Sequence, residues 1–324
     1  MELHEPKNLY ELLTLNMEQR FANRVAFRWY DADQDVVVEK HFGEYAQDIR
    51  RAVNYYLSTI PDIQGKRVCV WSNNSYHYAV NCYGVMMAGG VIVPMNQRKS
   101  WEELHRELEL VEPSAILTDG DDYGCNEEMQ AAYGSLLRPM DAYKAYEPAE
   151  LVNRIRPEEL MVLMFTSGTT GRSKGVMLCE RNFFAVMPHH VRVGQRFCQL
   201  KNDPDLLVSH MTLLPMFHLG AFGCLFTWAW MGWAQNLGSL RSFYKDLKRM
   251  PSQDMAAVPV LVQSIHHDLM TGKQDKLGCE VTGLLLGDNV EGIAKELGGY
   301  GADKVMVCDS PLLKDYTTDA YAKV

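Results

Sequence analysis

Short apolar runs alternate with amphipathic segments along most of this chain, and this alternation is the feature that most constrains its fold. Runs typical of buried strands occur at residues 67–72, 91–95 and 115–119. Segments with apolar residues at helical spacing lie between or beside them, at residues 43–57, 75–90 and 100–111. A repeated strand–helix succession predicts an α/β fold with mostly parallel sheets covered by helices.

The remaining patterns extend this α/β reading in both directions along the chain. Residues 8–21 have helical spacing behind Asn8, a residue type favoured at helix starts. RVAFRWY at 24–30 and DVVVEKHF at 35–42 indicate two strands around a polar turn. Residues 120–157 are polar with weak signals, which predicts a subdomain boundary before pattern resumes at 159–165.

Composition bounds the class of protein. The chain has 324 residues, of which 47% are hydrophobic, enough for two domains or subdomains. Its formal net charge of −9 gives no support to a nucleic-acid role. The longest apolar run, residues 219–234, is shorter than the roughly 20 residues of a membrane span, so we expect a buried helix. The start has no signal-peptide pattern, and the eight cysteines form no Cys-x-x-Cys pair, which favours a cytoplasmic protein with reduced thiols.

One stretch, FTSGTTGRSKGVM at 165–177, consists largely of hydroxyl, glycine and basic residues and directly follows the apolar run 159–165. Gly168, Gly171 and Gly175 allow successive backbone N–H groups to turn toward one anion. Further donors for anionic oxygens come from Arg172, Lys174 and the hydroxyl groups of Thr166, Ser167, Thr169, Thr170 and Ser173. This composition behind a buried strand predicts a phosphate-binding loop. An ordinary surface loop is the alternative.

The loop differs from the two best-known phosphate motifs. A Walker A loop has a glycine before its lysine and a hydroxyl residue after it. Here Ser173 precedes Lys174 and Gly175 follows it. The chain also has no Gly-x-Gly-x-x-Gly dinucleotide turn.

TSGTTGRSKGV resembles the signature of the AMP-forming acyl-CoA synthetases, which belong to the adenylate-forming enzyme superfamily. Other segments resemble the family in the expected order: residues 89–119, ERNFFAV directly after the loop, and LLPMFHLGAFG with its Pro-x-x-His element. The resemblance covers about residues 5–277. It implies that residues 1–277 form an AMP-binding large domain with two mostly parallel, helix-covered sheets.

The resemblance also implies a reaction. A carboxylate attacks the α-phosphate of ATP bound with Mg²⁺, giving an acyl-adenylate and pyrophosphate, and a thiol such as coenzyme A then takes the acyl group. His218 lies, by this resemblance, near the carboxylate and the α-phosphate, although its chemistry alone equally suits a structural histidine. The implied ligands of the β- and γ-phosphates are Thr166, Ser167, Gly168, Thr169, Thr170, Gly171 and Lys174.

Two histidine pairs invite a metal-site reading, His189–His190 and His266–His267. Neighbouring residues on a helix point in different directions, so we expect solvated or capping histidines instead. The sequence therefore predicts no protein metal site.

From Gly278 the sequence departs from this family. After residue 260 there is no Gly-Gly-Ala-type turn, no Tyr-Gly-x-Thr-Glu motif with its Mg²⁺-binding glutamate, no ribose-binding aspartate and no domain with the catalytic lysine. Residues 278–324 instead resemble the N-terminal region of the electron-transfer flavoprotein α subunit, most closely in GDNVEGIAKEL and YGADKV. The tail stops before that subunit's flavin-binding domain, so no flavin is expected.

Three hypotheses follow. The favoured one is a hybrid or truncated acyl-CoA synthetase fragment that keeps the ATP phosphate loop and is catalytically incomplete. The second is an active enzyme that recruits its missing groups from another chain, and the third is an electron-transfer docking protein. For the tail we predict that residues 281–286 and 304–308 run parallel within the second subdomain's sheet, replacing the lost family unit.

Overall fold

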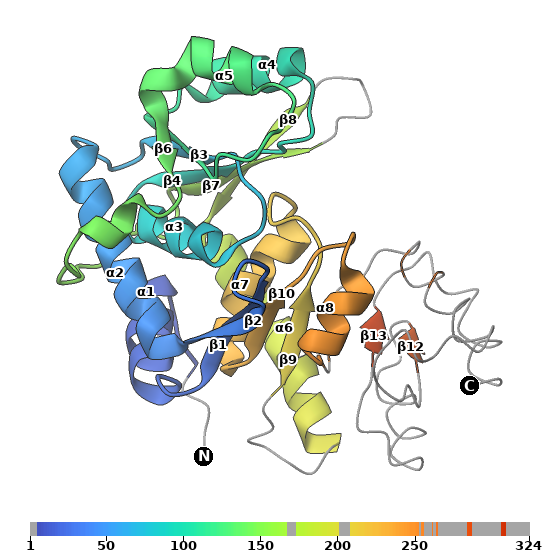
Figure 1. Cartoon of the computed structure of the whole chain (residues 1–324). Helices are drawn as coiled ribbons and strands as arrows, with labels where there is room; N and C mark the ends of the chain where they lie inside the picture. The colour runs from blue at the N-terminus through green and yellow to red at the C-terminus, as the bar shows by residue number, and fades with distance from the viewer. Residues whose placement is uncertain are drawn as a thin grey trace. The chain divides into compact units, whose positions relative to one another are not determined.

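The computed structural model describes residues 5–166, 173–200, 208–252, 254–255, 261, 264, 284–286 and 306–308. The chain divides into two compact units whose segments interleave in sequence (Figure 1). Unit 1 comprises Met1–Asn23, Phe42–Met187 and Pro215–Phe226, and unit 2 comprises Arg24–His41, Pro188–Leu214 and Thr227–Val324. Each unit contains one large sheet, which confirms the α/β class.

Unit 1 is built on a six-stranded sheet in the order β6-β5-β3-β4-β7-β8. All neighbouring strands run parallel except β7 and β8, which form an antiparallel pair at one edge. The strands are β3 (Arg67–Val70), β4 (Val91–Pro94), β5 (Ala115–Thr118), β6 (Leu137–Pro139), β7 (Leu160–Thr166) and β8 (Lys174–Cys179).

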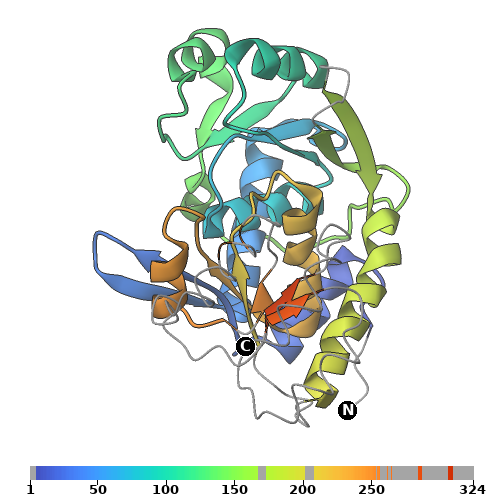
Figure 2. The ribbon, with the colours of Figure 1, turned by 90° about the vertical axis from the view of Figure 1, so that its right-hand side faces the viewer.

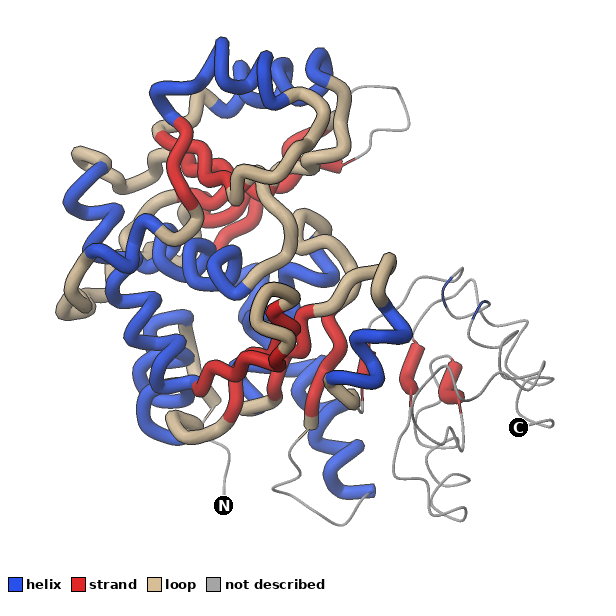
Figure 3. The backbone as a smooth tube through the Cα atoms, in the orientation of Figure 1, coloured by secondary structure: helices blue, strands red, loops and turns tan. Residues whose placement is uncertain are grey.

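Helices cover both faces of this sheet (Figure 3). They are α1 (Leu9–Glu11) with a π-helical continuation (Leu12–Arg20), α2 (Phe42–Thr59), α3 (Tyr76–Met87), α4 (Trp101–Val111) and α5 (Asn126–Tyr133), with short 3-10 turns at Gly134–Leu136 and Ala142–Ala145. Side chains cap free N–H groups at the starts of α1, α3 and α4. Asn8 Oδ1 accepts from Glu11 N at 2.8 Å, as the sequence predicts, and Ser75 Oγ accepts from Tyr78 N at 3.0 Å.

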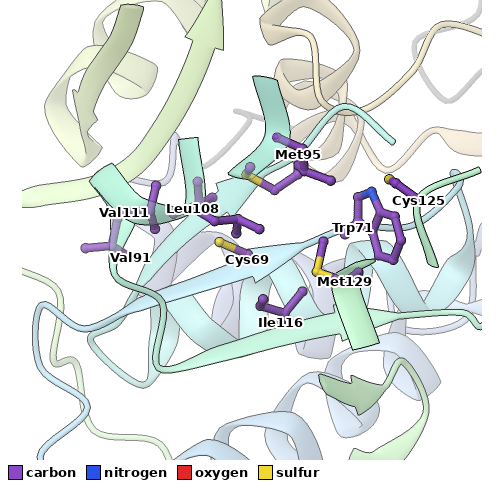
Figure 4. Close-up of a cluster of buried hydrophobic side chains, with 11 residues drawn as sticks. Cys69, Trp71, Val91, Met95, Leu108, Val111, Ile116, Cys125 and Met129 are labelled. Atoms are coloured by element: carbon purple, nitrogen blue, oxygen red, sulfur yellow. The ribbon is translucent and has the colours of Figure 1, made fainter. Parts of the chain in front are cut away.

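The apolar core of unit 1 forms where α4 and α5 pack on β3, β4 and β5 (Figure 4). Helix α3 lies on the opposite face and is buried at nearly every position, because α2 packs against its outer side. A helix covered on all sides is mostly apolar, and in α3 the polar exceptions His77 and Asn81 both have hydrogen-bond partners. The cluster under α4 and α5 comprises Cys69, Trp71, Val91, Val93, Met95, Leu104, Leu108, Val111, Ile116, Cys125 and Met129.

Unit 2 contains a five-stranded sheet in the order β11-β9-β10-β1-β2. The predicted hairpin of β1 and β2 is antiparallel, and the other neighbours are parallel. The elements are β1 (Val25–Asp31), β2 (Val36–His41), β9 (Ser209–Thr212), β10 (Ala234–Leu237), β11 (Asp254–Met255) and α8 (Phe243–Arg249).

Two longer helices contribute residues to both units, α6 (Glu180–Leu200) and α7 (Leu219–Met231). Helix α7 confirms the buried helix expected from the longest apolar run, since most of its side chains are buried. Among the described helices, none is both long enough and apolar enough to cross a membrane.

The predicted subdomain boundary at residues 120–157 is wrong. Helix α5 and strand β6 lie in this stretch, and β6 pairs in parallel with β5 to extend the sheet of unit 1. The stretch has weak sequence signals because α5 is largely solvent-exposed and β6 is a short edge strand.

The prediction for the tail is half right. Strands β12 (Leu284–Leu286) and β13 (Met306–Cys308) pair in parallel, with Leu284 opposite Met306. In the described part of the chain, however, they form a two-stranded sheet of their own and make no ladder with the five-stranded sheet. Two parallel strands can pair with each other without a third strand, so the apolar pattern of these two segments did not specify a partner sheet. We expect Gly287 and Asp288 at the family's adenine-side turn and Asp309–Ser310 in place of its Mg²⁺ motif, but these four residues lie outside the described residues.

Candidate nucleotide-phosphate site

The predicted phosphate loop connects β7 to β8 at an edge of the sheet in unit 1 (Figure 2). Thr166 lies opposite Lys174 in the antiparallel register, and Thr166 Oγ1 donates to the Lys174 carbonyl oxygen at 3.4 Å. The first and last residues of the loop are therefore held side by side. The residues between them that we expect to bind phosphate, Ser167, Gly168, Thr169, Thr170 and Gly171, lie outside the described residues, as does Arg172.

The loop begins at the carboxyl end of β7, which runs parallel to β4, β3 and β5. Ligands of open α/β sheets bind at this end of the strands. Polar side chains gather there: Gln97 Nε2 donates to Asn73 Oδ1 at 2.9 Å, and the Asn73 N–H donates to Asp119 Oδ2 at 2.9 Å. Hydrogen bonds thus join the segments that follow β3, β4 and β5 at the carboxyl ends of the parallel strands, which is also where the loop begins.

Lys99, in the segment after β4, reaches the loop directly. Its Nζ donates to Ser173 Oγ at 3.0 Å and lies 5.8 Å from the centre of the Phe165 ring. The same ammonium pairs with the Glu107 carboxylate. The side chains of Lys99 and Glu107 are only 12% and 3% exposed. A positive charge therefore stands beside the last residues of the loop, held by a buried acid.

Sequence reasoning did not single out Lys99 or Glu107. A signal was present, because Glu107 lies on the apolar face of α4, three residues after Leu104 and next to Leu108. A carboxylate at a core position of an amphipathic helix indicates a buried partner. Nothing local in the sequence says which of the chain's lysines and arginines that partner is.

Gly175 needs a correction. We expected it to shape an anion nest with Gly168 and Gly171, but it lies in strand β8 opposite Phe165. A Cβ at this position would stand 3.0 Å from Leu163 Cδ1, closer than ordinary packing. The glycine is therefore explained by this close approach across the hairpin.

His218 lies just before α7 in the part of unit 1 formed by residues 215–226. Its N–H donates to the Pro215 carbonyl at 3.0 Å, and its carbonyl accepts from Phe222 N at 2.9 Å. Asn74 Oδ1, after β3, accepts from Met216 N at 2.8 Å, which ties this segment to the carboxyl end of β3. The His218 side chain reaches the surface, and loss of part of its hydration lowers its pKa below the usual 6.5, so the imidazole is neutral at pH 7.

The expectation that the two histidine pairs bind no metal stays a prediction. His189 and His190 lie in α6, whereas His266 and His267 fall outside the described residues. Among described residues there is no group of three or more His, Cys, Asp or Glu side chains placed to hold a metal ion. The donors around the loop, which are lysine ammonium and hydroxyl groups, suit phosphate oxygens.

The family of AMP-binding enzymes matches residues 19–306 of the chain. A 2-succinylbenzoate–CoA ligase of Bacillus cereus is 30% identical over 170 residues, which are 52% of this chain and 32% of that ligase. The chain thus matches about a third of that relative's length. The fold is similar to O-succinylbenzoate coenzyme A synthetase of Bacillus subtilis in complex with ATP and magnesium ion, with a TM-score of 0.62 at 18% identity over 78% of this chain and 65% of that one.

A second similarity is of another kind. Fifty residues, 15% of the chain, are 72% identical to the acryloyl-CoA reductase electron transfer subunit beta of Anaerotignum propionicum, of which they cover 14%. This match supports the predicted resemblance of part of the chain to an electron-transfer subunit. The family match to AMP-binding enzymes runs past residue 277 to 306, so it does not mark the expected junction.

Proposed function

The chain belongs to the AMP-binding enzyme family, and from this premise we propose that it binds the polyphosphate of ATP through the β7–β8 loop, as a fragment of an AMP-forming acyl-CoA ligase. The observation that carries the proposal is the loop itself. The sequence that follows the carboxyl end of β7 is rich in glycine and hydroxyl residues. Thr166 and Lys174, at the two ends of the loop, pair in the antiparallel register of β7 and β8. Two lysines lie at the end of the loop: Lys99 donates to Ser173, and Lys174 is the next residue in the sequence.

In this proposal the loop contacts the β- and γ-phosphates, where negative charge increases as pyrophosphate leaves. The ligands are Thr166, Ser167, Gly168, Thr169, Thr170, Gly171 and Lys174. A backbone nest closes on the anion from several N–H groups, and Lys174 adds a full positive charge. The neutral His218, on the segment tied to β3, contacts the carboxylate substrate near the α-phosphate.

The chemistry is carboxylate activation. The carboxylate oxygen attacks the α-phosphorus of ATP, the bond from that phosphorus to the bridging oxygen breaks, and pyrophosphate leaves with the electron pair. Magnesium, when bound with ATP, supplies charge neutralisation on the phosphates. Coenzyme A is the thiol acceptor that the CoA ligase relatives suggest. The acid substrate is a carboxylic acid of undefined chain length.

We further propose that residues 1–277 are an incomplete AMP-binding large domain and residues 278–324 an electron-transfer-flavoprotein-like fragment, in a cytoplasmic protein. The sequence lacks the Tyr-Gly-x-Thr-Glu motif and the catalytic-lysine domain of the family. Alone, these 324 residues therefore bind ATP weakly without completing the reaction. The match covers 14% of the electron-transfer relative, so we propose no flavin site on these residues.

Calorimetric titration with ATP tests the site. Lys174→Ala should weaken binding by about 1.5–3 kcal/mol, the size of a hydrogen bond between charged groups, which is roughly 10- to 150-fold in Kd. Gly168→Val should abolish binding, because a side chain there blocks the close backbone approach. Lys144→Met, at an exposed ion pair, is the matched charge control and should bind as wild type does. Equal ATP affinity in the wild type and all three variants would show that the loop is a linker and does not bind phosphate.

Catalytic incompleteness has its own test. Pyrophosphate exchange into ATP, measured with a panel of short and long carboxylates, should stay at background. An acid-dependent exchange signal would show that these residues suffice for adenylation.

The second candidate function rests on the 50 residues that are 72% identical to an electron-transfer subunit. A docking protein would bind an electron-transfer partner through residues 278–324 and would do so equally well after Gly168→Val. Co-purification of a flavoprotein that is lost on deleting this tail, with no ATP binding in the wild type, would favour this function over the first.

A further inference from the structure

Lys99 and Glu107 form an ion pair in a place where few ions are found. The Glu107 side chain is 3% exposed on the core face of α4, and the Lys99 side chain is 12% exposed. The second carboxylate oxygen, Glu107 Oε2, is buried and has no hydrogen-bond partner among the described residues. Removing two ions from water is costly, and an apolar pair of similar volume is often as stable or more stable. Stability alone does not account for this pair.

The pair has one contact that an apolar pair could not make, the hydrogen bond from Lys99 Nζ to Ser173 Oγ at 3.0 Å. An ammonium group donates and never accepts, so Ser173 Oγ is the acceptor. The hydroxyl hydrogen of Ser173 therefore points away from Lys99 and remains to be donated elsewhere. A hydroxyl that accepts from a cation is also a stronger donor, because hydrogen bonds in a chain polarise one another.

Ser173 lies at the end of the predicted phosphate loop, where a hydroxyl donor can reach a bound phosphate. It is the residue directly before Lys174, at the start of β8, where the antiparallel register with β7 begins. Phe165, on the facing strand, lies against the same ammonium at 5.8 Å. Lys99 thus contacts both arms of the hairpin while Glu107 holds it from α4.

We propose that Lys99, held by Glu107, is a positioning residue that fixes the Ser173 hydroxyl as a hydrogen-bond donor to the bound phosphate. This inference deepens the proposed ATP site and rests on it. It assigns to Glu107, on helix α4, the task of holding the lysine that orients the last hydroxyl donor of the loop. The cost of burying the pair is then offset in the bound state.

The decisive variant replaces both charges, Lys99→Met with Glu107→Leu. It removes the ion pair without leaving a lone buried charge, so thermal stability should be kept or raised. ATP affinity should nevertheless fall about tenfold, the effect of one hydrogen bond to a charged group. Ser173→Ala should lose a similar factor, and the triple variant should lose no more than either, because all three changes remove the same donor. Ser173→Thr, which keeps the hydroxyl, should bind as wild type does.

Amide hydrogen exchange without nucleotide separates this inference from the ATP proposal. In the double variant, the amides of residues 173–175 should exchange several-fold faster than in wild type, whereas Lys144→Met should leave them unchanged. If wild type binds no ATP but this acceleration is seen, the ATP site fails and the anchoring of Ser173 stands. If wild type binds ATP and the double variant and Ser173→Ala both keep that affinity, Lys99 does not position the loop. If the double variant does not fold, Ser173→Ala against Ser173→Thr decides.

Discussion

The central strands of the two sheets are buried to a similar degree, but those of unit 1 bury apolar side chains and those of unit 2 bury many polar ones. In unit 1 the central strands β3, β4 and β5 are apolar along almost their whole length. In unit 2 every position of β9 and β10 is also buried, but Ser209, His210, Thr212, Gln235 and Asn236 are polar. The central strands of unit 1 are therefore held by apolar packing, whereas β9 and β10 add hydrogen bonds, which have direction, to the apolar cluster around Met211 and Phe243.

Two of these buried polar side chains of unit 2 hold a neighbouring segment. Asn236 Nδ2 donates to the Met250 carbonyl at 3.2 Å and to Ser252 Oγ at 2.8 Å, which fastens the turn after α8. His210 Nδ1 and Asp254 Oδ2, directly opposite in the register of β9 and β11, are 2.5 Å apart. Polar pairs of this kind select one register among those that apolar strands would accept. In unit 1 the buried acids Glu107 and Glu180 instead lie outside the strands.

The largest effect we expect from this contrast is at Ile116, fully buried in the cluster under α4 and α5. Ile116→Ala should lower the free energy of unfolding by about 2–5 kcal/mol, because it removes methyl groups and leaves a cavity. Ile116→Val is the matched control, with a cost of about 0.5–1.5 kcal/mol. Urea denaturation measures both. A cost for Ile116→Ala no larger than for the valine variant would contradict a close-packed core.

Asn236 should give a smaller effect. Asn236→Leu keeps the side-chain size but leaves the Met250 carbonyl without its side-chain donor, at a cost of about 1–3 kcal/mol in the free energy of unfolding. Amide exchange near Ser252 should rise with it. Asn153→Ala, at an exposed site, should change neither quantity. A stabilised leucine variant would mean that the hydrogen bonds of Asn236 contribute nothing to the stability of unit 2.

The smallest effect concerns pH and Glu180, which accepts from the Leu9 N–H at 2.8 Å. Burial raises the pKa of Glu180 above its usual 4.5, and the Leu9 bond offsets part of that rise. The folded protein then holds the proton more tightly than the unfolded chain, so the free energy of unfolding falls as pH increases from about 4.5 through the raised pKa. Glu180→Gln should flatten this slope. A slope that survives the substitution must come from another group.

Elements with strong local signals could be predicted from the sequence, and elements defined by distant contacts could not. The helix start at Asn8, the β1–β2 hairpin and β7 were predicted because caps, turn residues and apolar runs are local. Strand β8 was not, because four of its six residues are exposed and follow a glycine-rich loop. The same limit applies to the site. A local cluster of glycine and hydroxyl residues predicts the loop, whereas the Lys99–Ser173 hydrogen bond could not be predicted because it joins positions 74 residues apart.

The pairing of β1 with β10 has a consequence for how the chain is made. Phe27 of β1 lies beside Gln235 of β10, so about 200 residues separate the two partners in sequence. At about 5–20 residues per second of synthesis, the β1–β2 hairpin waits roughly 10–40 s for the strand that completes its sheet. During that interval the apolar edge of β1 is open to other nascent chains. We therefore expect the yield of folded protein to depend on how well this unpaired strand edge is shielded during synthesis.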